Sequence, residues 1–568
     1  MNEFVLGINC AGFNSSTVLL RDGEIVSAVE EERLTRQKRT RRFPIEGIKF
    51  CLTSAGIEIE NLTAIAVSWN PFINLETFSR ANSDVTRFLG ELLYSVPNHL
   101  LQLHSSGISD VSVQQLHLEK GKTSIFYVRH HLSHAASYLV SPFEDAAILT
   151  TDAFGEKQST SFSRGHLTEV AEIWSQNFPH SLGGFYSTFT EYLGFQPQSD
   201  EWKLMGASAF GDPKRFREKV RCLYSLSENS NLGFELNLSH FDFFQFHTPH
   251  RYSQRLKDHL GLPPRRQDES LNQSYFDLAA AAQEAFTDIY LHLLRQLHDA
   301  TGSPNVVIAG GCALNSLANG RVLVDTDFEN CFIPPVPDDS GAALGAASYV
   351  HHQILKREKR TVMRHNYLGP KYSPEEIIAT LKQYQIPYEL LENSSRTAAQ
   401  LISEGKVIGW FQDRLEFGDR ALGNRSILAD PRIPEMADRV NQAIKYRESF
   451  RPFAPAVLLE KADRYFDDLT PTPYMERVLP IVSSARKKIP AVTHRDGTGR
   501  LQTVSDAQNT KFYKLICEFE VITGVPVVLN TSFNVKGEPI VCSPSDALRT
   551  FYTSGLDALI IENCLVSK

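Results

Sequence analysis

The chain has 568 residues, of which 42% are hydrophobic and 22% are charged, and its formal net charge is -8. The length exceeds what one hydrophobic core usually organises, and the composition excludes a disordered or fibrous chain, so two or more globular domains are expected. The acidic balance disfavours a large nucleic-acid interface, and we expect no nucleic-acid partner.

The first predicted elements are three short strands, over residues 4–8, 16–20 and 24–29, joined by turns that contain Gly12 and Asp22-Gly23. The same pattern returns with strands over residues 146–151, 159–163 and 167–173. Two such units predict a duplicated α/β domain. The arrangement resembles the actin-like and sugar-kinase ATPase fold, in which glycine turns bring backbone N–H groups close to nucleotide phosphates.

A basic run, RLTRQKRTRR over residues 33–42, follows the first strands and is either a solvated turn or an anion-binding loop. Further along, the sequence His130-His131-Leu132-Ser133-His134 places two imidazoles at positions i and i+4, on one face of a helix. Such a pair can hold a divalent transition metal if carboxylates complete the shell, and Asp152 and Asp339 are the candidates. The alternative is one core histidine beside solvated neighbours.

A long amphipathic helix over residues 276–297 leads into a strand over 305–309, then Gly310-Gly311 and a helix that begins at Cys312. A strand, two glycines and a helix allow a nucleotide to approach the backbone, although a structural turn explains the glycines equally well. A helix of small residues over 342–347 follows, with Asp339 near its start, where an N-cap role is the alternative to metal binding.

The basic connector over residues 356–364 predicts a domain boundary near residue 360, with domains 1–360 and 361–568. The second domain begins with a helix over 374–384, a strand near Tyr388, a helix over 395–404 and a strand over 406–411. Arg420 and Arg425 then lie five residues apart in a glycine-bracketed loop, which suits bidentate recognition of an anion. Residues 500–503 and 530–534 are predicted to be further polar loops of the same site.

The eight cysteines are scattered without a CxxC pair, which favours reduced thiols and a cytoplasmic protein over a disulfide framework. No basic n-region precedes an apolar segment, and no apolar run reaches 18 residues. We therefore expect neither export nor a membrane partner.

Ten motifs, in this order along nearly the whole chain, resemble the ATP-dependent O-carbamoyltransferases of antibiotic and nodulation-factor biosynthesis. They are EEERLTR (30–36), HHLSHAAS (130–137), TDAFGE (151–156), SLGGFYSTFTEYLGF (181–195), KLMG (203–206), AGGCALN (309–315), PPVPDDSGAALGAA (334–347), GDRALGNRSIL (418–428), RPFAPAVL (451–458) and LNTSFNVKGEPIV (529–541). The resemblance implies an actin-like ATPase and carbamoyl-transfer domain, joined to an α/β domain that forms carbamoyl adenylate from carbamoyl phosphate and ATP. The carbamoyl group would then pass to a small-molecule acceptor of secondary metabolism.

The resemblance also assigns roles to residues. The metal ligands would be His130, His134, Asp152 and Asp339, with iron as the family's usual metal; the ligand types suit Fe(II), Mn or Zn. ATP, with Mg, would contact Asp152, Gly155, Gly310, Gly311, Asn315 and Asp339. Carbamoyl phosphate would contact Lys38, Arg420, Lys445, Arg451, Arg500 and Asn530, and the catalytic residues would be His130, His134, Lys38 and Arg420. Homodimers are common in this family, and the sequence leaves the oligomeric state open.

Two positions depart from the family pattern. The family usually has His-Asp in the first hairpin, where Phe13-Asn14 stand here, and phenylalanine cannot accept the proton of an acceptor hydroxyl. His131 or His180 could serve instead, or the acceptor could be an amine, or transfer could be impaired. Asp419 replaces a proline and adds a negative charge beside Arg420.

Other functions stay open at this point: a non-catalytic nucleotide- and metal-binding partner, a tRNA-modifying enzyme, or a plain sugar kinase. The sugar kinase leaves the second domain unexplained. The acceptor itself is not readable, and the long segments 70–121 and 234–273 are where its contacts are expected.

Overall fold

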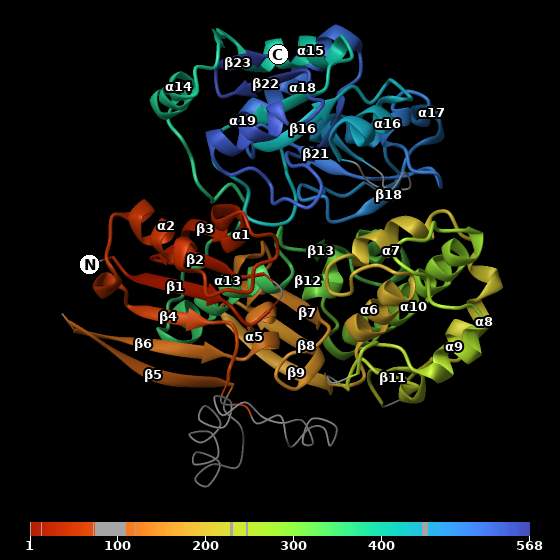
Figure 1. Cartoon of the computed structure of the whole chain (residues 1–568). Helices are drawn as coiled ribbons and strands as arrows, with labels where there is room; N and C mark the ends of the chain where they lie inside the picture. Colours follow the sequence, from red (N-terminus) through yellow and green to blue (C-terminus); the bar gives the residue numbers. More distant parts are fainter. Residues whose placement is uncertain are drawn as a thin grey trace. The chain divides into compact units, whose positions relative to one another are not determined.

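A computed structural model describes residues 2–12, 14–71, 73, 110–119, 121–227, 231–245, 248–445, 453–467 and 469–568, without the side chain of Lys445. The chain divides into two units (Figure 1). The first consists of Met1–Val26, Arg41–Pro44 and Cys51–Met363. The second consists of Ser27–Thr40, Ile45–Phe50 and Arg364–Lys568.

The first unit contains two mixed sheets with the same plan. One has the strand order β3-β2-β1-β4-β6-β5, and the other has the order β13-β12-β7-β8-β9. In each, a central strand pairs antiparallel with the next strand and parallel with a later one: β1 with β2 and β4, and β7 with β8 and β12. The predicted duplicated α/β fold is therefore confirmed.

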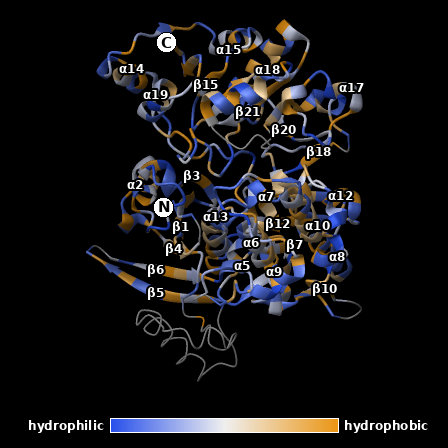
Figure 2. Cartoon of the chain, turned by 45° about the vertical axis from the view of Figure 1, so that its right-hand side comes forward, coloured by the Kyte–Doolittle hydropathy of each residue, from blue (hydrophilic) through white to orange (hydrophobic). Residues whose placement is uncertain are grey.

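The strands of this unit begin and end as follows: β1 (Phe4–Asn9), β2 (Ser16–Arg21), β3 (Glu24–Glu30), β4 (Ala64–Val67), β5 (Val111–Leu118), β6 (Gly121–Val128), β7 (Asp145–Thr151), β8 (Gln158–His166), β9 (Glu169–Asn177), β10 (Tyr224–Leu226), β11 (Phe234–Leu236), β12 (Asn305–Ala309) and β13 (Asn330–Phe332). Of these, β3 is divided between the two units at Ser27. The side chains of β1 and nearly all those of β7 are buried, as is typical of strands covered on both faces. Figure 2 shows the hydropathy of the residues along the chain.

The helices of the first unit include α5 (His130–Ala135), α6 (Leu182–Tyr192), α7 (Glu201–Ser208), α8 (Arg217–Arg221), α9 (Gln254–Leu260), α10 (Gln273–Thr301), α11 (Ser316–Asn319), α12 (Val322–Asp325) and α13 (Asp339–Tyr349), whereas α2 (Ile45–Ala55) is divided between the two units at Cys51. Of these, α13 packs against β1, β2 and α5. The approach is close: a Cβ on Gly345 would overlap the carbonyl oxygen of Ser133 in α5, and one on Gly7 of β1 would overlap that of Ala343. The small residues of α13 thus bring its first residue, Asp339, to the histidines of α5.

The second unit is built on an eight-stranded sheet with the order β14-β23-β22-β15-β16-β21-β17-β20. Its strands are β14 (Glu389–Leu390), β15 (Ile408–Phe411), β16 (Arg425–Ala429), β17 (Ala454–Leu458), β20 (Gln502–Val504), β21 (Val527–Ser532), β22 (Ala558–Ile561) and β23 (Cys564–Ser567), with a separate pair β18 (Val478–Pro480) and β19 (Thr498–Arg500). Its helices are α1 (Glu31–Thr35), α14 (Pro374–Gln383), α15 (Ser394–Ser403), α16 (Met436–Val440), α17 (Ser483–Arg486), α18 (Thr510–Thr523) and α19 (Pro544–Tyr552).

Some local predictions were wrong. Residues 311–314 form a 3-10 turn, and the next α-helix, α11, begins at Ser316 rather than at Cys312. The segment 234–273 contains β11 and α9 and is less irregular than expected, whereas most of 70–121 lies outside the described residues. Residues 500–503 and 530–532 lie largely in strands β19, β20 and β21 rather than in polar loops; all of β20 and the first four residues of β21 are buried.

Candidate functional site

Four buried side chains from three elements converge in the first unit. His130 and His134 lie one turn apart on α5, Asp152 follows β7, and Asp339 begins α13. The Nε2 atoms of the two histidines are 3.1 Å apart, and the Nε2 of His134 lies 3.2 Å from Oδ2 of Asp152 and 3.6 Å from Oδ1 of Asp339. One ligand atom from each residue lies within 4.8 Å of the others, so the group can hold a metal ion.

The charges of this group support one another. Burial alone would lower the pKa of His130, but hydrogen bonds to Asp152 and Asp339 outweigh it and hold that pKa well above its usual value. Burial would raise the pKa of Asp152, but its hydrogen bonds with His130 and His134 hold it well below. The carboxylates therefore stay ionised, as metal ligands must be.

Backbone groups fix the carboxylate of Asp152 and lie close to that of Asp339. Oδ1 of Asp152 accepts a hydrogen bond from the N–H of Ala153 at 2.7 Å, and Oδ2 accepts one from the N–H of Gly311 at 3.1 Å. Any Cβ on Gly12, in the turn of the first hairpin, would overlap the carboxylate of Asp339. The expected N-cap role of Asp339 is wrong, since Asp338 occupies the N-cap position and Asp339 is the first residue of the helix.

Glu156 is a positioning residue that the sequence did not single out. Its side chain is buried, and Oε1 accepts hydrogen bonds from the N–H groups of Asn70, at 2.7 Å, and His130, at 3.0 Å. Glu156 thereby joins the turn after Asp152 to the first residue of α5. No spacing rule could have found it, because its partners are backbone groups distant in sequence.

The two histidines considered as substitutes for the missing base have different surroundings. His131 is buried, and its Nδ1 lies 2.7 Å from the hydroxyl of Thr150. Burial, followed by the charges of His130 and His134, lowers the pKa of His131 well below its usual value. His180 is less buried, and its Nδ1 accepts a hydrogen bond from the N–H of Leu236. Phe13 lies outside the described residues.

The residues considered for ATP lie around the same carboxylates. Gly310 has a φ of 93°, and a Cβ there would overlap the carbonyl oxygen of Thr151. A Cβ on Gly155 would lie 2.9 Å from the ring of His131. The side chain of Asn315 is engaged by Gln283, at 3.0 and 3.1 Å, and caps α11 through the N–H of Ala318. Gly155 and Gly310 thus pack closely on the residues around the carboxylates, whereas the side chain of Asn315 is engaged by α10 and α11.

A second charged group lies within the second unit, where the segment after α1 meets the loop 418–420. Burial would raise the pKa of Asp419, but the charges of Arg39, Arg420, Arg33 and Lys38 outweigh it and lower that pKa. The guanidinium of Arg33 donates to the carbonyl oxygen of Gly418 at 2.8 Å. Lys38 and Arg420, assigned by resemblance to carbamoyl phosphate, are thus brought together around the aspartate that replaces the family's proline.

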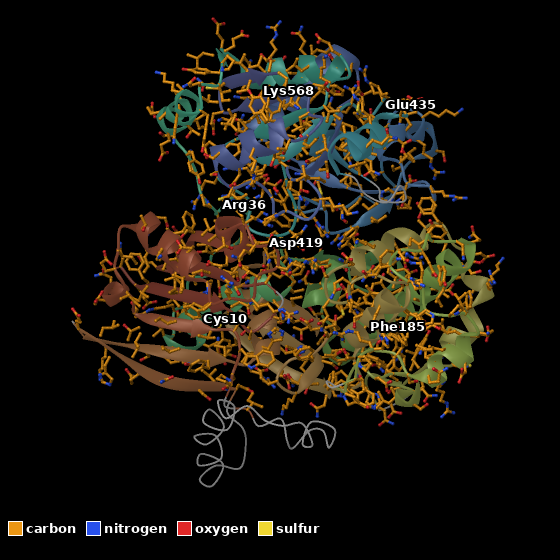
Figure 3. The ribbon with its side chains drawn as sticks, viewed as in Figure 1. Cys10, Arg36, Phe185, Asp419, Glu435 and Lys568 are labelled. Atoms are coloured by element: carbon orange, nitrogen blue, oxygen red, sulfur yellow. The ribbon has the colours of Figure 1, made fainter. Side chains whose placement is uncertain are left out.

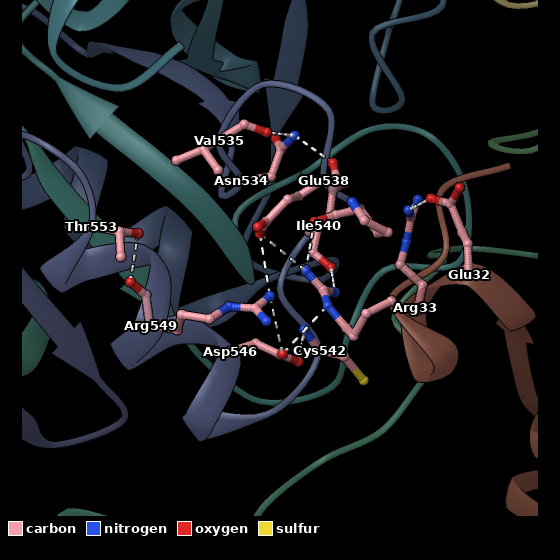
Figure 4. A network of polar contacts seen from close by, with 12 residues as sticks. Glu32, Arg33, Asn534, Val535, Glu538, Ile540, Cys542, Asp546, Arg549 and Thr553 are labelled. Carbon is pink, nitrogen blue, oxygen red and sulfur yellow. Dashed lines mark hydrogen bonds and ion pairs between the residues drawn. The ribbon is translucent and has the colours of Figure 1, made fainter. Parts of the chain in front are cut away.

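A neighbouring network anchors the segment after α1 (Figure 4). Arg36, labelled in Figure 3, donates to the carbonyl oxygens of Pro539, at 2.8 Å, and Ile540, and its Nε lies 3.3 Å from a carboxylate oxygen of Asp546. Asp546 in turn accepts from Ser543 in the capping box of α19. Arg33 and Arg36 are therefore tied to main-chain carbonyls, whereas Lys38 and Arg420 remain the anion ligands that the resemblance assigns to this region.

The prediction that Arg425 helps to bind an anion is wrong. Its side chain is fully buried at the start of β16, and its guanidinium donates to the carbonyl oxygens of Gln412, Asn424, Pro370 and Asp413. It also lies 3.5 Å above the centre of the Phe411 ring. Arg425 is a structural residue.

Asn530 lies on β21, where its amide donates to the carbonyl oxygen of Ala421 at 3.1 Å and to Oε1 of Gln502 at 2.8 Å. The side-chain oxygen of Asn530, Oδ1, is buried and accepts no hydrogen bond from any described residue. Gln502 also lines a small polar cavity with Tyr474 and Asn509. Arg500 lies near His494, and Arg451 and the side chain of Lys445 are outside the described residues.

Two family models match the chain: the carbamoyltransferase N-terminus over residues 5–348 and the carbamoyltransferase C-terminus over residues 399–568. The chain belongs to the carbamoyltransferase family. The enzyme is 37% identical to nodulation protein NolNO of Sinorhizobium fredii, over 98% of this chain and 79% of that protein. It is also 37% identical to an uncharacterised protein of Synechocystis, over 99% of this chain and 96% of that protein.

The solved structure of HypF from T. kodakarensis aligns with this carbamoyltransferase at 12% identity and a TM-score of 0.30, over 62% of this chain and 48% of that chain, a similarity too low to establish a common fold. Among the described residues of the carbamoyltransferase, no helix is long and apolar enough to cross a membrane. Two imidazole nitrogens and two ionised carboxylates are a donor set that suits a divalent transition metal, so the predicted metal fits the residues present.

Proposed function

We propose that this carbamoyltransferase activates a carbamoyl group as carbamoyl adenylate and transfers it to a small-molecule acceptor. The observation that carries the proposal is the match of both family models together with two separate charged groups, one that fits a metal and one that fits an anion. Activation is assigned to the second unit and transfer to the first.

Atom balance defines the activation step. Carbamoyl phosphate and water give carbamate and inorganic phosphate; a carbamate oxygen then attacks the α-phosphorus of ATP, forming a new P–O bond as pyrophosphate leaves. Negative charge develops on the phosphoryl oxygens, and cationic side chains aimed at that charge stabilise the transition state. Lys38 and Arg420 are the described residues that would supply it, and the charge of Asp419 offsets part of theirs.

In the transfer step, the acceptor oxygen or nitrogen attacks the carbamoyl carbon, AMP leaves, and a base takes the acceptor proton. A metal held by His130, His134, Asp152 and Asp339 would act as a Lewis acid, with Fe(II), Mn or Zn all compatible with the ligands. Glu156 holds the start of α5 beside the turn that follows Asp152, and Gly12 allows the first hairpin to approach the carboxylate of Asp339. General-base help is worth about 10²- to 10⁴-fold, so an acceptor that needs less of it, such as an amine, fits a chain with phenylalanine in the first hairpin.

The acceptor is proposed to be a hydroxyl or amine of a secondary metabolite, such as an antibiotic precursor, in the cytoplasm and without nucleic acid or membrane as a partner. The resemblance of the ten motifs to the carbamoyltransferases of antibiotic and nodulation-factor biosynthesis supports a small-molecule acceptor.

The test is the release of pyrophosphate and phosphate from ATP and carbamoyl phosphate by the purified full chain without any acceptor. We expect pyrophosphate release that requires carbamoyl phosphate, with one phosphate formed for each pyrophosphate. Pyrophosphate release that ignores carbamoyl phosphate, or none while ATP still binds, would overturn the proposal.

A further inference from the structure

A run of aromatic rings in the first unit ends at the turn that carries the metal ligand Asp152. The ring centres of Phe185 and Phe241 are 6.0 Å apart, those of Phe241 and Phe243 are 5.8 Å apart, and Phe243 lies 5.9 Å from Phe178. Phe178 then contacts Phe154, at 6.1 Å. These five rings, of which Phe185 is labelled in Figure 3, are called the aromatic run below.

Exposure increases along the aromatic run. Phe185 and Phe241 are fully buried, Phe178 and Phe243 are 8% and 6% exposed, and Phe154 is half-buried. Phe154 is also the second residue after Asp152, in the same turn. The run therefore has a base buried in the core and ends in a partly buried ring two residues after Asp152. Core packing explains the buried rings of the aromatic run but does not require a partly buried ring at this turn.

The first turn of α6 packs against both the aromatic run and the turn that contains Asp152 and Ala153. Ser181, the N-cap of α6, donates its hydroxyl to the carbonyl oxygen of Ala153 at 2.6 Å. A Cβ on Gly183 would lie 2.6 Å from the backbone nitrogen of Ala153, and one on Gly184 would lie 2.6 Å from the ring of Phe243. Only glycines allow this packing, so the aromatic run and Asp152 are held in one fixed geometry.

We propose that Phe154, backed by Phe178 and Phe243, is one wall of the acceptor subsite and that the acceptor carries an aromatic ring close to its reacting group. The inference rests on the proposed function, because the acceptor must reach the carbamoyl group at the metal ligands. A fixed phenylalanine ring with an accessible face or edge favours a second aromatic ring at 4.5–7 Å, which adds a factor of about 2 to 13 to affinity. A polycationic or highly hydroxylated acceptor would leave its polar groups unpaired against this wall.

The test is saturation-transfer NMR on the full chain with two probe alcohols, 2-phenylethanol and 2-cyclohexylethanol, which differ in ring planarity but little in size. We expect transfer to the ring protons of 2-phenylethanol that falls about 3- to 10-fold in Phe154→Leu, which keeps an apolar side chain but removes the ring. The matched control is Phe43→Leu, since Phe43 is a 52% exposed phenylalanine of the same unit; this variant should match the wild type.

Three outcomes would overturn the inference: no transfer to 2-phenylethanol in the wild type, equal transfer to both alcohols, or a signal that Phe154→Leu leaves unchanged. Pyrophosphate release by the wild type, measured separately, distinguishes failure of this inference from failure of the proposed function. If pyrophosphate is not released but the binding of 2-phenylethanol depends on Phe154, the result supports the subsite and contradicts the proposed activation step.

Discussion

The two charged groups of this enzyme neutralise their charges in different ways. In the first unit, two histidines and two carboxylates face one another directly, and glycines bring the elements together. In the second unit, Arg33, Lys38, Arg39 and Arg420 surround Asp419, with Glu30 and Glu32 beside Arg33, and Arg33, Arg36 and Arg425 also donate to main-chain carbonyl oxygens. The first arrangement favours the binding of a cation, whereas the second favours the binding of an anion.

The largest expected effect is the loss of metal from the first group. We predict that His134→Ala lowers the affinity for Fe(II), Mn or Zn by more than about 1,000-fold, because it removes one of four ligands and leaves two carboxylates facing a single imidazole. Metal content after dialysis, measured by mass spectrometry, checks this. His166→Ala is the control, since His166 is an exposed histidine of the same unit. Equal metal content in both variants would contradict the assigned site.

The next effect belongs to the second group. Arg420→Met is expected to lower carbamoyl-phosphate-dependent pyrophosphate release by about 100- to 1,000-fold, since one cationic group at developing negative charge is removed. Steady-state kinetics with varied carbamoyl phosphate would measure it. Arg396→Met, at an exposed arginine on α15, should retain the wild-type rate. If Arg420→Met releases pyrophosphate normally, the anion site lies elsewhere.

A smaller effect is expected at Glu156, which supports a ligand without being one. Glu156→Ala should weaken metal binding by about 10- to 100-fold, as for other residues that orient a metal ligand, because the N–H groups of His130 and Asn70 lose their acceptor. Glu156→Gln keeps an acceptor oxygen and should restore most of the affinity. Titration of each variant with metal compares the two. Similar losses in both variants would show that the charge matters rather than the hydrogen bonds.

The smallest effect concerns stability and pH. Burial raises the pKa of Glu476 in the second unit from 4.5 to about 7. A carboxyl with a raised pKa in the folded state stabilises the fold below pH 4.5, and this contribution is lost as the pH rises through 7. Glu476→Gln cannot ionise at this position. Its melting temperature should therefore rise relative to that of the wild type as the pH increases from 5 to 8. A constant difference between the two proteins over that range would contradict the shift.

Much of the first unit could be predicted because its signals are local. Alternating apolar residues and glycine turns predicted the paired hairpins, and the spacing of His130 and His134 predicted two ligands of one metal group. The structure brings Asp152 and Asp339 to them, and their role as ligands stays a prediction. Glu156 could not be predicted, since a carboxylate that accepts from backbone N–H groups leaves no pattern in the sequence.

The second unit was harder to predict because arginines look alike in a sequence. Arg420 and Arg425 lie in one motif, but burial and four carbonyl acceptors make Arg425 structural, and only the folded chain shows that difference. The grouping of residues 27–40 with the second unit depends on interactions between residues far apart in the sequence, such as those of Arg36 with Pro539 and Asp546. Local periodicity carries no information about such interactions.

That grouping has a consequence for how the protein is made. Residues 27–40 leave the ribosome long before the loop 539–546 that receives Arg36, and at about 5–20 residues per second the wait is on the order of 25–100 s. During that time Leu34, which packs against Ile540 and Cys542 in the finished fold, has no native neighbours there. This early segment is thus among the last parts of the chain to complete its native contacts.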